Sequence, residues 1–195
     1  MRTERQLTKM VKLRKFVAYQ NLERPYTRVS KYTNQNFVRG GFPNIKIIKF
    51  DMGTPQKDYD TVLTLKSERS MNIRQNAIEA ARMTSNRSLE KTAGKDYHLR
   101  IKIYPFHILR ENPLATGAGA DRLSTGMKKS YGKSIGCAAR VKEGQTLIEL
   151  RINKVHLKLG REALARAAKK FPCSCKIAVA PSKIIAVPSK IAVAQ

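Results

Sequence analysis

The chain has 195 residues, enough for one ordinary domain with a hydrophobic core. It carries 39 Lys and Arg against 14 Asp and Glu, a net charge of +25, and 42% of its residues are hydrophobic. So basic a chain needs a polyanionic partner, and its hydrophobic content argues against a disordered basic tail. No run of about 18 apolar residues occurs, which argues against a membrane-spanning helix.

The N-terminal segment predicts a basic arm. Residues 1 to about 40 are basic and polar without a clear period, which is typical of a segment that follows phosphates; a solvated, disordered terminus is the alternative. The segment lacks the apolar core of a secretory signal. The chain has three cysteines, Cys137, Cys173 and Cys175, and this odd number does not resemble a disulfide framework. We therefore expect a cytosolic protein.

Strand and helix patterns then alternate. Strands are predicted over residues 45–50 and 61–66. A helix is predicted from Ile73 to Leu89, with Asn72 and Gln75 at its start and Gly94 at its end. Residues 97–104 alternate strictly, which predicts a strand with one apolar face and one basic face. The apolar face holds Leu99, Ile101 and Ile103, and the other holds His98, Arg100, Lys102 and Tyr104.

The second half begins with a glycine-rich loop over residues 111–134. A loop this long in a compact domain is usually functional or disordered. Strands over 137–141 and 146–152, joined by a turn at Glu143 and Gly144, predict a β-hairpin. A helix from Leu159 to Lys170 and a strand from Lys176 to Val179 follow. Two helices among about six strands predict an α+β sandwich built on a mixed sheet.

Three regions are expected: a basic arm (1–23), a folded domain (24–179) and a repeat tail (180–195). The tail continues a period of seven, KIAVAPS, KIIAVPS and KIAVAQ, in which the prolines forbid a continuous helix. We expect only the first copy to belong to the fold.

Enzymatic and metal motifs are weak. Gly132-Lys133-Ser134 resembles the end of a P-loop, but five residues separate it from Gly126 where the motif needs four. Arg122 occupies the third glycine position of a dinucleotide fingerprint. Cys173 and Cys175 lack the second ligand cluster of a structural zinc site, so we expect small, partly buried side chains at a helix-to-strand junction. No enzyme activity is predicted.

The loop's composition favours contact with RNA. Its glycines allow close approach of the backbone, and it carries Arg122, Lys128, Lys129 and Lys133. A mobile loop whose charges are only solvated is the alternative. KH and RRM signatures are missing, so binding to phosphates and to the shape of a folded RNA is expected.

Several ordered segments carry a family resemblance: RPYTR (24–28), KIIKFDMG (46–53), NAIEAAR (76–82), KIYPFHILREN (102–112), GAGADRLSTGM (117–127), YGK (131–133) and EALARAAKKFP (162–172). Over about residues 24–179 the chain resembles the universal large-subunit ribosomal protein called L-sixteen in bacteria and L-ten-e in archaea and eukaryotes. Ser134 stands where that family usually has proline. The arm before Arg24 is longer than expected for that family, and the repeat after Val179 has no counterpart in it.

The resemblance implies a hammerhead-like sandwich with a mostly antiparallel sheet, two helices and the long glycine-rich loop. It implies a structural protein of the large ribosomal subunit in the cytoplasm, with no cofactor of its own and any structural Mg²⁺ held through the rRNA. The expected partners are large-subunit rRNA near the peptidyl transferase centre, 5S rRNA, A-site and P-site tRNA and neighbouring ribosomal proteins, but no membrane. A free RNA-binding or RNA-modifying protein, with the loop as its active site, and a peripheral membrane protein are the alternatives.

Candidate residues follow from this interpretation. The expected rRNA-binding residues are Arg24, Arg28, Arg39, Arg100, Lys102, Arg110, Arg122, Lys128, Lys129, Lys133 and Arg140. The expected tRNA-proximal residues of the loop are Gly117, Gly119, Asp121, Arg122 and Gly126.

Overall fold

The computed structural model describes residues 17–22, 24–27, 32, 38, 42–112, 114–115, 117–124, 126–127 and 130–181. Most of the predicted arm and the later repeat copies lie outside these residues, as do four predicted RNA-binding residues, Arg28, Arg39, Lys128 and Lys129. Within the described part, no helix has the length and apolar character needed to cross a membrane.

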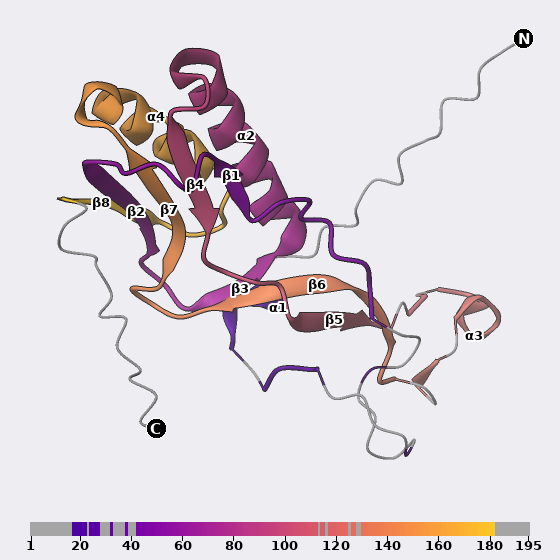
Figure 1. Cartoon of the computed structure of the whole chain (residues 1–195). Coiled ribbons are helices and arrows are strands. Elements are labelled where there is room, and N and C mark those ends of the chain that lie inside the picture. Colours follow the sequence, from indigo (N-terminus) through magenta and orange to yellow (C-terminus); the bar gives the residue numbers. More distant parts are fainter. Residues whose placement is uncertain are drawn as a thin grey trace, which may run out of the picture.

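The larger layer is a five-stranded sheet whose pairings are all antiparallel. Its order is β1 (Asp51–Gly53), β4 (Tyr97–Ile101), β7 (Thr146–Ile152), β2 (Thr61–Ser67) and β8 (Cys175–Pro181). The helices α2 (Gln75–Ala93) and α4 (Leu157–Ala168) pack against each other and over this sheet (Figure 1). A 3-10 turn, η3 (Lys154–His156), precedes α4.

Buried aliphatic side chains between the helices and this sheet form the core. Leu150 on β7 lies opposite Leu63 on β2 and Leu99 on β4, and all three are fully buried. Gly160 brings α4 close to the sheet, because a Cβ atom there would lie 3.2 Å from Cδ2 of Leu150. The strand faces that sequence alternation predicted are therefore the faces that form the core.

The smaller layer is a three-stranded antiparallel sheet in the order β3 (Met71–Arg74), β6 (Lys133–Val141) and β5 (His107–Glu111). It runs crosswise beneath the larger sheet (Figure 1). The long loop joins β5 to β6 and contains a short helix, α3 (Ala120–Leu123), at the end of the molecule remote from α4. The short α1 (Val17–Gln20) lies against β3, where the Asn72 amide donates to the Asn21 carbonyl at 3.0 Å.

Two predicted strand arrangements are wrong. Residues 45–49 form no strand, and the sheet begins instead with Asp51–Gly53. The backbone N–H of Lys46 donates to the Gln75 side chain at 3.0 Å, so this N–H has a hydrogen-bond acceptor outside the sheet. The predicted hairpin of residues 137–152 is also wrong, because β6 and β7 belong to different sheets. In the turn between them, the N–H of Gly144 donates to the carbonyl of Ser67, and the chain passes from one sheet to the other.

The first long helix starts later than predicted. Met71–Arg74 is a strand, the helix begins at Gln75, and its N-cap residue Arg74 makes no side-chain capping bond. The Gln75 side chain is engaged by Lys46, so it does not cap the helix. The predicted end at Gly94 is confirmed, with a positive φ of 59°. The α+β class, the strand at 61–66, the second helix and the final strand are confirmed as well.

Candidate nucleic-acid interface

The loop is closed at its base by an arginine held between two tyrosines. The guanidinium of Arg110, near the end of β5, lies 4.5 Å from the ring centre of Tyr26 and 4.2 Å from that of Tyr131. It donates hydrogen bonds to the Tyr26 hydroxyl at 2.9 Å and to the Tyr131 carbonyl at 2.8 Å. We call Tyr26, Arg110, Tyr131 and Gly132 the loop neck. Arg110, predicted as an RNA contact, joins the N-terminal segment to the end of the loop.

The N-terminal segment 24–27 follows the outer edge of β5. The Tyr26 N–H donates to Nδ1 of His107 at 3.1 Å, and the Ile108 N–H donates to the Tyr26 carbonyl at 3.3 Å. The Tyr26 and His107 rings stack with their centres 5.7 Å apart. The segment thus covers an edge strand that would otherwise expose unpaired backbone groups.

Gly132 allows the two ends of the loop to meet. Its φ is +82°, and an added Cβ atom would lie 2.6 Å from the carbonyl carbon of Glu111. The next residue, Lys133, lies opposite Glu111 in the β5–β6 pairing. A side-chain bond from Asn112 to the Gly126 carbonyl, 3.3 Å, ties the loop across its width. The glycine is required here by the close approach of two backbones.

Beyond the neck, the loop presents glycine backbone and positive charge. Gly117, Gly119 and Gly126 all have positive φ, and Gly119 precedes α3. Asp121 and Arg122 belong to α3, and the Arg122 side chain is exposed with no ion pair in the described part of the chain. The α3 helix that carries this cation lies away from α2 and α4 (Figure 1).

A second group of cations lies on the face of the five-stranded sheet opposite the helices. Glu149 is only 5% exposed, and its carboxylate forms ion pairs with Lys102 at 2.8 Å and with Arg151 at 2.9 Å. Burial alone would raise the pKa of Glu149, but hydrogen bonds from Lys102 and Arg151 outweigh it and lower the pKa below its usual value. Its carboxylate therefore holds both cations in place while neutralising part of their charge.

The same face continues to the edge of the sheet. Asp51 on β1 lies 3.4 Å from Nε of Arg100 and 3.2 Å from Nε2 of His98, measured from Oδ1. Arg100 and Asp51 are both about half exposed, so their pairing is weakened by water. Arg100 is thus available to an RNA phosphate only in competition with Asp51.

The predicted RNA-binding residues fall into groups. Arg110 and Lys133 lie at the loop neck or beside it, Arg122 lies beyond it, and Arg100 and Lys102 lie on the sheet face. Arg24 is exposed in the segment along β5. Arg140 lies within β6 opposite Asn72, with its buried Nε unpartnered among the described residues. Most of the predicted residues that the structure describes therefore lie either at the loop or on one sheet face, although they are far apart in the sequence.

The predicted residues did not include Arg151, Tyr26 or Tyr131, which belong to these groups. Alternation in Thr146–Ile152 puts Arg151 on the face opposite the core, beside Lys102, so this signal was present. Tyr26 and Tyr131 had no comparable signal, because 105 positions separate them and only the fold brings both to Arg110.

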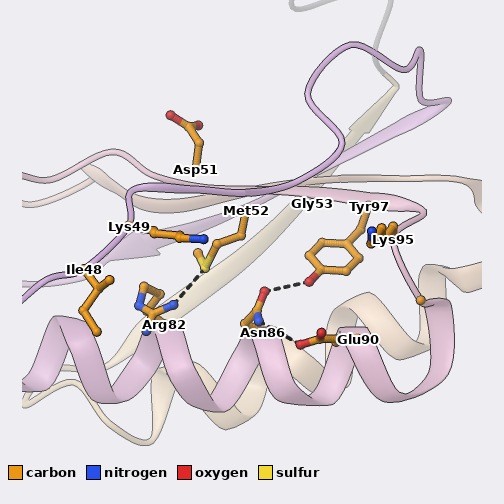
Figure 2. Close-up of a pocket in the computed structure, with 11 residues that line it drawn as sticks. Ile48, Lys49, Asp51, Met52, Gly53, Arg82, Asn86, Glu90, Lys95 and Tyr97 are labelled. Atoms are coloured by element: carbon orange, nitrogen blue, oxygen red, sulfur yellow. Dashed lines mark hydrogen bonds between the residues drawn. The ribbon is translucent and has the colours of Figure 1, made fainter.

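A hollow of about 470 Å³ lies between α2, β1 and the start of β4 (Figure 2). Met52 and Tyr97 form part of its lining, and Lys49 and Lys95 also border it. The Tyr97 hydroxyl donates to Asn86 at 2.6 Å, and the Asn86 amide donates to Glu90 at 3.3 Å. Tyr97, Asn86 and Glu90 thus form a chain of hydrogen bonds along one wall of the hollow.

Comparison with known proteins identifies the family. The profile of the family described as Ribosomal protein L16p/L10e matches residues 23–178. The chain belongs to this family. It is 43% identical over 162 residues to the large ribosomal subunit protein uL16 of Archaeoglobus fulgidus, covering 83% of this chain and 89% of that protein. It is 44% identical over 163 residues to uL16 of Staphylothermus marinus, covering 82% and 93%.

Family membership confirms the resemblance inferred from the segments above. The chain is therefore a ribosomal protein, and its place in the cell is the ribosome, as expected. The matched residues 23–178 contain the loop neck, the loop and the charged sheet face. The repeat copies after Pro181 lie outside the match.

Proposed function

We propose that the chain is a structural constituent of the large ribosomal subunit that binds large-subunit rRNA and 5S rRNA. Its glycine-rich loop reaches towards the peptidyl transferase centre and helps to position A-site and P-site tRNA, while RNA performs the chemistry. One observation carries the proposal: the neck at Arg110 and Gly132 presents Arg122 and the loop backbone away from the folded body. Both relatives named above bear the name of a large-subunit protein.

The two cationic groups suit different parts of this role. On the sheet face, Lys102 and Arg151 are fixed by Glu149, which favours contact with a rigid, folded RNA surface. At the loop, Arg122 has no carboxylate partner among the described residues, so its full charge is available to a phosphate. The expected rRNA contacts are therefore shared between body and loop, and the expected tRNA contacts belong to the loop alone.

A free RNA-modifying enzyme is the second candidate, and the geometry gives it little support. Such an enzyme needs an activated base, nucleophile or metal near the loop. The described residues include no group of three or more side chains suited to hold a metal ion. Asn112 and Tyr131 at the loop instead make structural hydrogen bonds. We therefore favour positioning over catalysis.

Directed hydroxyl-radical probing tests the location of the loop. Ser124, at the end of α3, is replaced by cysteine in a chain carrying Cys173→Ser and Cys175→Ser, and iron-EDTA is attached. In subunits bound to tRNA, cleavage is expected in rRNA of the peptidyl transferase centre and in the acceptor end of tRNA. The matched control carries the tether at Met83, an exposed position on α2, and should leave the tRNA intact. Equal cleavage of tRNA from both positions would contradict the proposed placement.

A further inference from the structure

Two cysteines meet where α4 leads into β8. The Sγ atoms of Cys173 and Cys175 lie 3.6 Å apart, and both residues are partly exposed. The sequence predicted small, partly buried side chains at this junction, and their position is confirmed. What the sequence did not show is that the two thiols face each other.

The backbone on either side holds this pair in place. Cys175 lies opposite Ser67 in the pairing of β8 with β2. The N–H of Glu68 donates to the carbonyl of Ser174 at 3.1 Å, between the two cysteines. A disulfide needs its sulfur atoms about 2.0 Å apart, so closure asks for a shift of roughly 1.5 Å.

The environment gives the two thiols different reactivities. The hydrogen bond with Cys175 and a weaker one from the Ser67 hydroxyl at 3.5 Å lower the pKa of Cys173 to about 6, although burial opposes the shift. The same bond with Cys173, together with burial, raises the pKa of Cys175. At neutral pH Cys173 is therefore the thiolate and Cys175 keeps its proton.

The other charged groups nearby are Glu68 and its partner Lys176. Glu68 raises the pKa of Cys173 by charge repulsion, and Lys176 neutralises part of this effect through an ion pair of 3.0 Å. The third cysteine, Cys137, is buried in β6, and burial raises its pKa. Of the three cysteines, Cys173 has a lowered pKa, Cys175 lies beside it with a raised pKa, and Cys137 is buried away from both.

We propose that Cys173 and Cys175 form a modification site at which hydrogen peroxide converts the two thiols into an intrachain disulfide. The Cys173 thiolate attacks one peroxide oxygen; an S–O bond forms, the O–O bond breaks, and the departing hydroxide takes up a proton to become water. The Cys175 sulfur then attacks the resulting sulfenic acid; the S–S bond forms, the S–O bond breaks, and hydroxide leaves with the Cys175 proton as a second water. Two thiols are oxidised by two electrons, and one peroxide is reduced to two waters.

Oxidation fits this pair better than metal binding. A structural zinc ion takes four ligands, and the described residues include no group of three or more metal-binding side chains. A paired thiolate and thiol need no further ligand to form a disulfide. The site is also independent of the RNA-binding proposal, since neither sulfur belongs to the loop or to the charged sheet face.

Peroxide treatment of the full chain, followed by alkylation and peptide mass spectrometry, tests the site. The peptide with both cysteines is expected to lose the mass of two hydrogen atoms, to resist alkylation, and to recover both thiols after dithiothreitol. Cys137 should remain alkylatable once the chain is denatured. Oxidation of Cys137 as fast as Cys173, or disulfides between chains only, would overturn the proposal.

Single variants separate the two roles. In Cys175→Ser, Cys173 should stop at a sulfenic acid that dimedone traps, because no resolving thiol is present. In Cys173→Ser, Cys175 should react more slowly than Cys173 does in the native chain, because burial and the charge of Glu68 still raise its pKa when the Cys173 thiol is gone. Cys137→Ser is the matched control and should form the disulfide at the native rate. Equal rates for Cys173→Ser and the native chain would remove Cys173 as the attacking thiol.

Discussion

The guanidinium carbon of Arg110 lies 4.2 Å from the centre of the Tyr131 ring, and the same guanidinium donates to the Tyr131 carbonyl at 2.8 Å. Arg110 is the residue before the last of β5, where the loop begins, and Tyr131 lies shortly before β6, where the loop ends. The contact therefore fixes the distance between the two ends of the loop. Tyr26 also contacts the Arg110 guanidinium, and this contact ties the N-terminal segment to the loop neck.

Replacing Arg110 with lysine should loosen the loop neck while keeping the charge. A lysine ammonium cannot reproduce the contacts of the planar guanidinium with both rings together with its two hydrogen bonds, to the Tyr26 hydroxyl and the Tyr131 carbonyl. With about 0.5–1 kcal/mol for each exposed cation–π contact, the expected loss in free energy of unfolding is about 1–2 kcal/mol. Limited proteolysis within residues 112–132 should be faster than in the native chain. The control Arg122→Lys should be cleaved at the native rate; equal cleavage of all three chains would contradict the role of the loop neck.

Replacing Gly132 with alanine should separate the ends of the loop. The new Cβ atom would meet the backbone of Glu111 and Asn112 at 2.6–2.8 Å, and a φ of +82° is unfavourable for alanine. The expected loss is about 2–4 kcal/mol, measured by denaturant unfolding. Gly136→Ala, in the β6 strand that follows Gly132, is the matched control, because the nearest neighbour of its new Cβ atom would lie at 3.9 Å. Similar losses at both positions would show that the close approach at Gly132 is unimportant.

Replacing Glu149 with glutamine should reduce stability and change its dependence on pH. The native pKa of Glu149 is lowered, so its contribution is present above the usual glutamate pKa of about 4.3 and is lost as the pH falls through the lower native value. At pH 7 the variant should be less stable by about 1–3 kcal/mol, because Lys102 and Arg151 lose a charged acceptor. The difference from the native chain should shrink in acid.

Denaturant unfolding between pH 7 and pH 3 measures this effect. Glu68→Gln is the control, since Glu68 pairs with the highly exposed Lys176 and should contribute little. A stability difference for Glu149→Gln that stays constant down to pH 3 would contradict the ion-paired carboxylate.

Local patterns predicted the elements that depend on them. Alternation around Leu99 and Leu150 identified the core faces of two strands, and Gly94 identified the end of a helix. Which strands would pair was not local: the turn at Gly144 looked like a hairpin, yet its N–H bonds to Ser67 of another strand. The loop was found from its glycines. Its neck was not, because the contacts of Arg110 join segments far apart in the sequence.

Removing the positive charge of the loop should weaken RNA binding and leave the fold intact. The variant Arg122→Ala, Lys128→Ala, Lys129→Ala loses no core side chain among the described residues, since Arg122 is exposed. Each lost phosphate contact should reduce the slope of log K against log salt by about 0.7–0.9. Binding to an rRNA fragment across a salt series measures it. A matched set of three cations on α4 and its C-cap residue, Arg161→Ala, Arg166→Ala and Lys169→Ala, should leave the slope unchanged. A fall in the unfolding temperature of the loop variant would mean that its side chains have buried partners in the fold.

Sucrose-gradient sedimentation at moderate and high salt tests the central claim, that this chain is built into the large ribosomal subunit through its loop and charged sheet face. We predict one copy per large subunit, retained at high salt because the loop and the sheet face bind together. Recovery of the native chain only at the top of the gradient, at either salt concentration, would contradict the account.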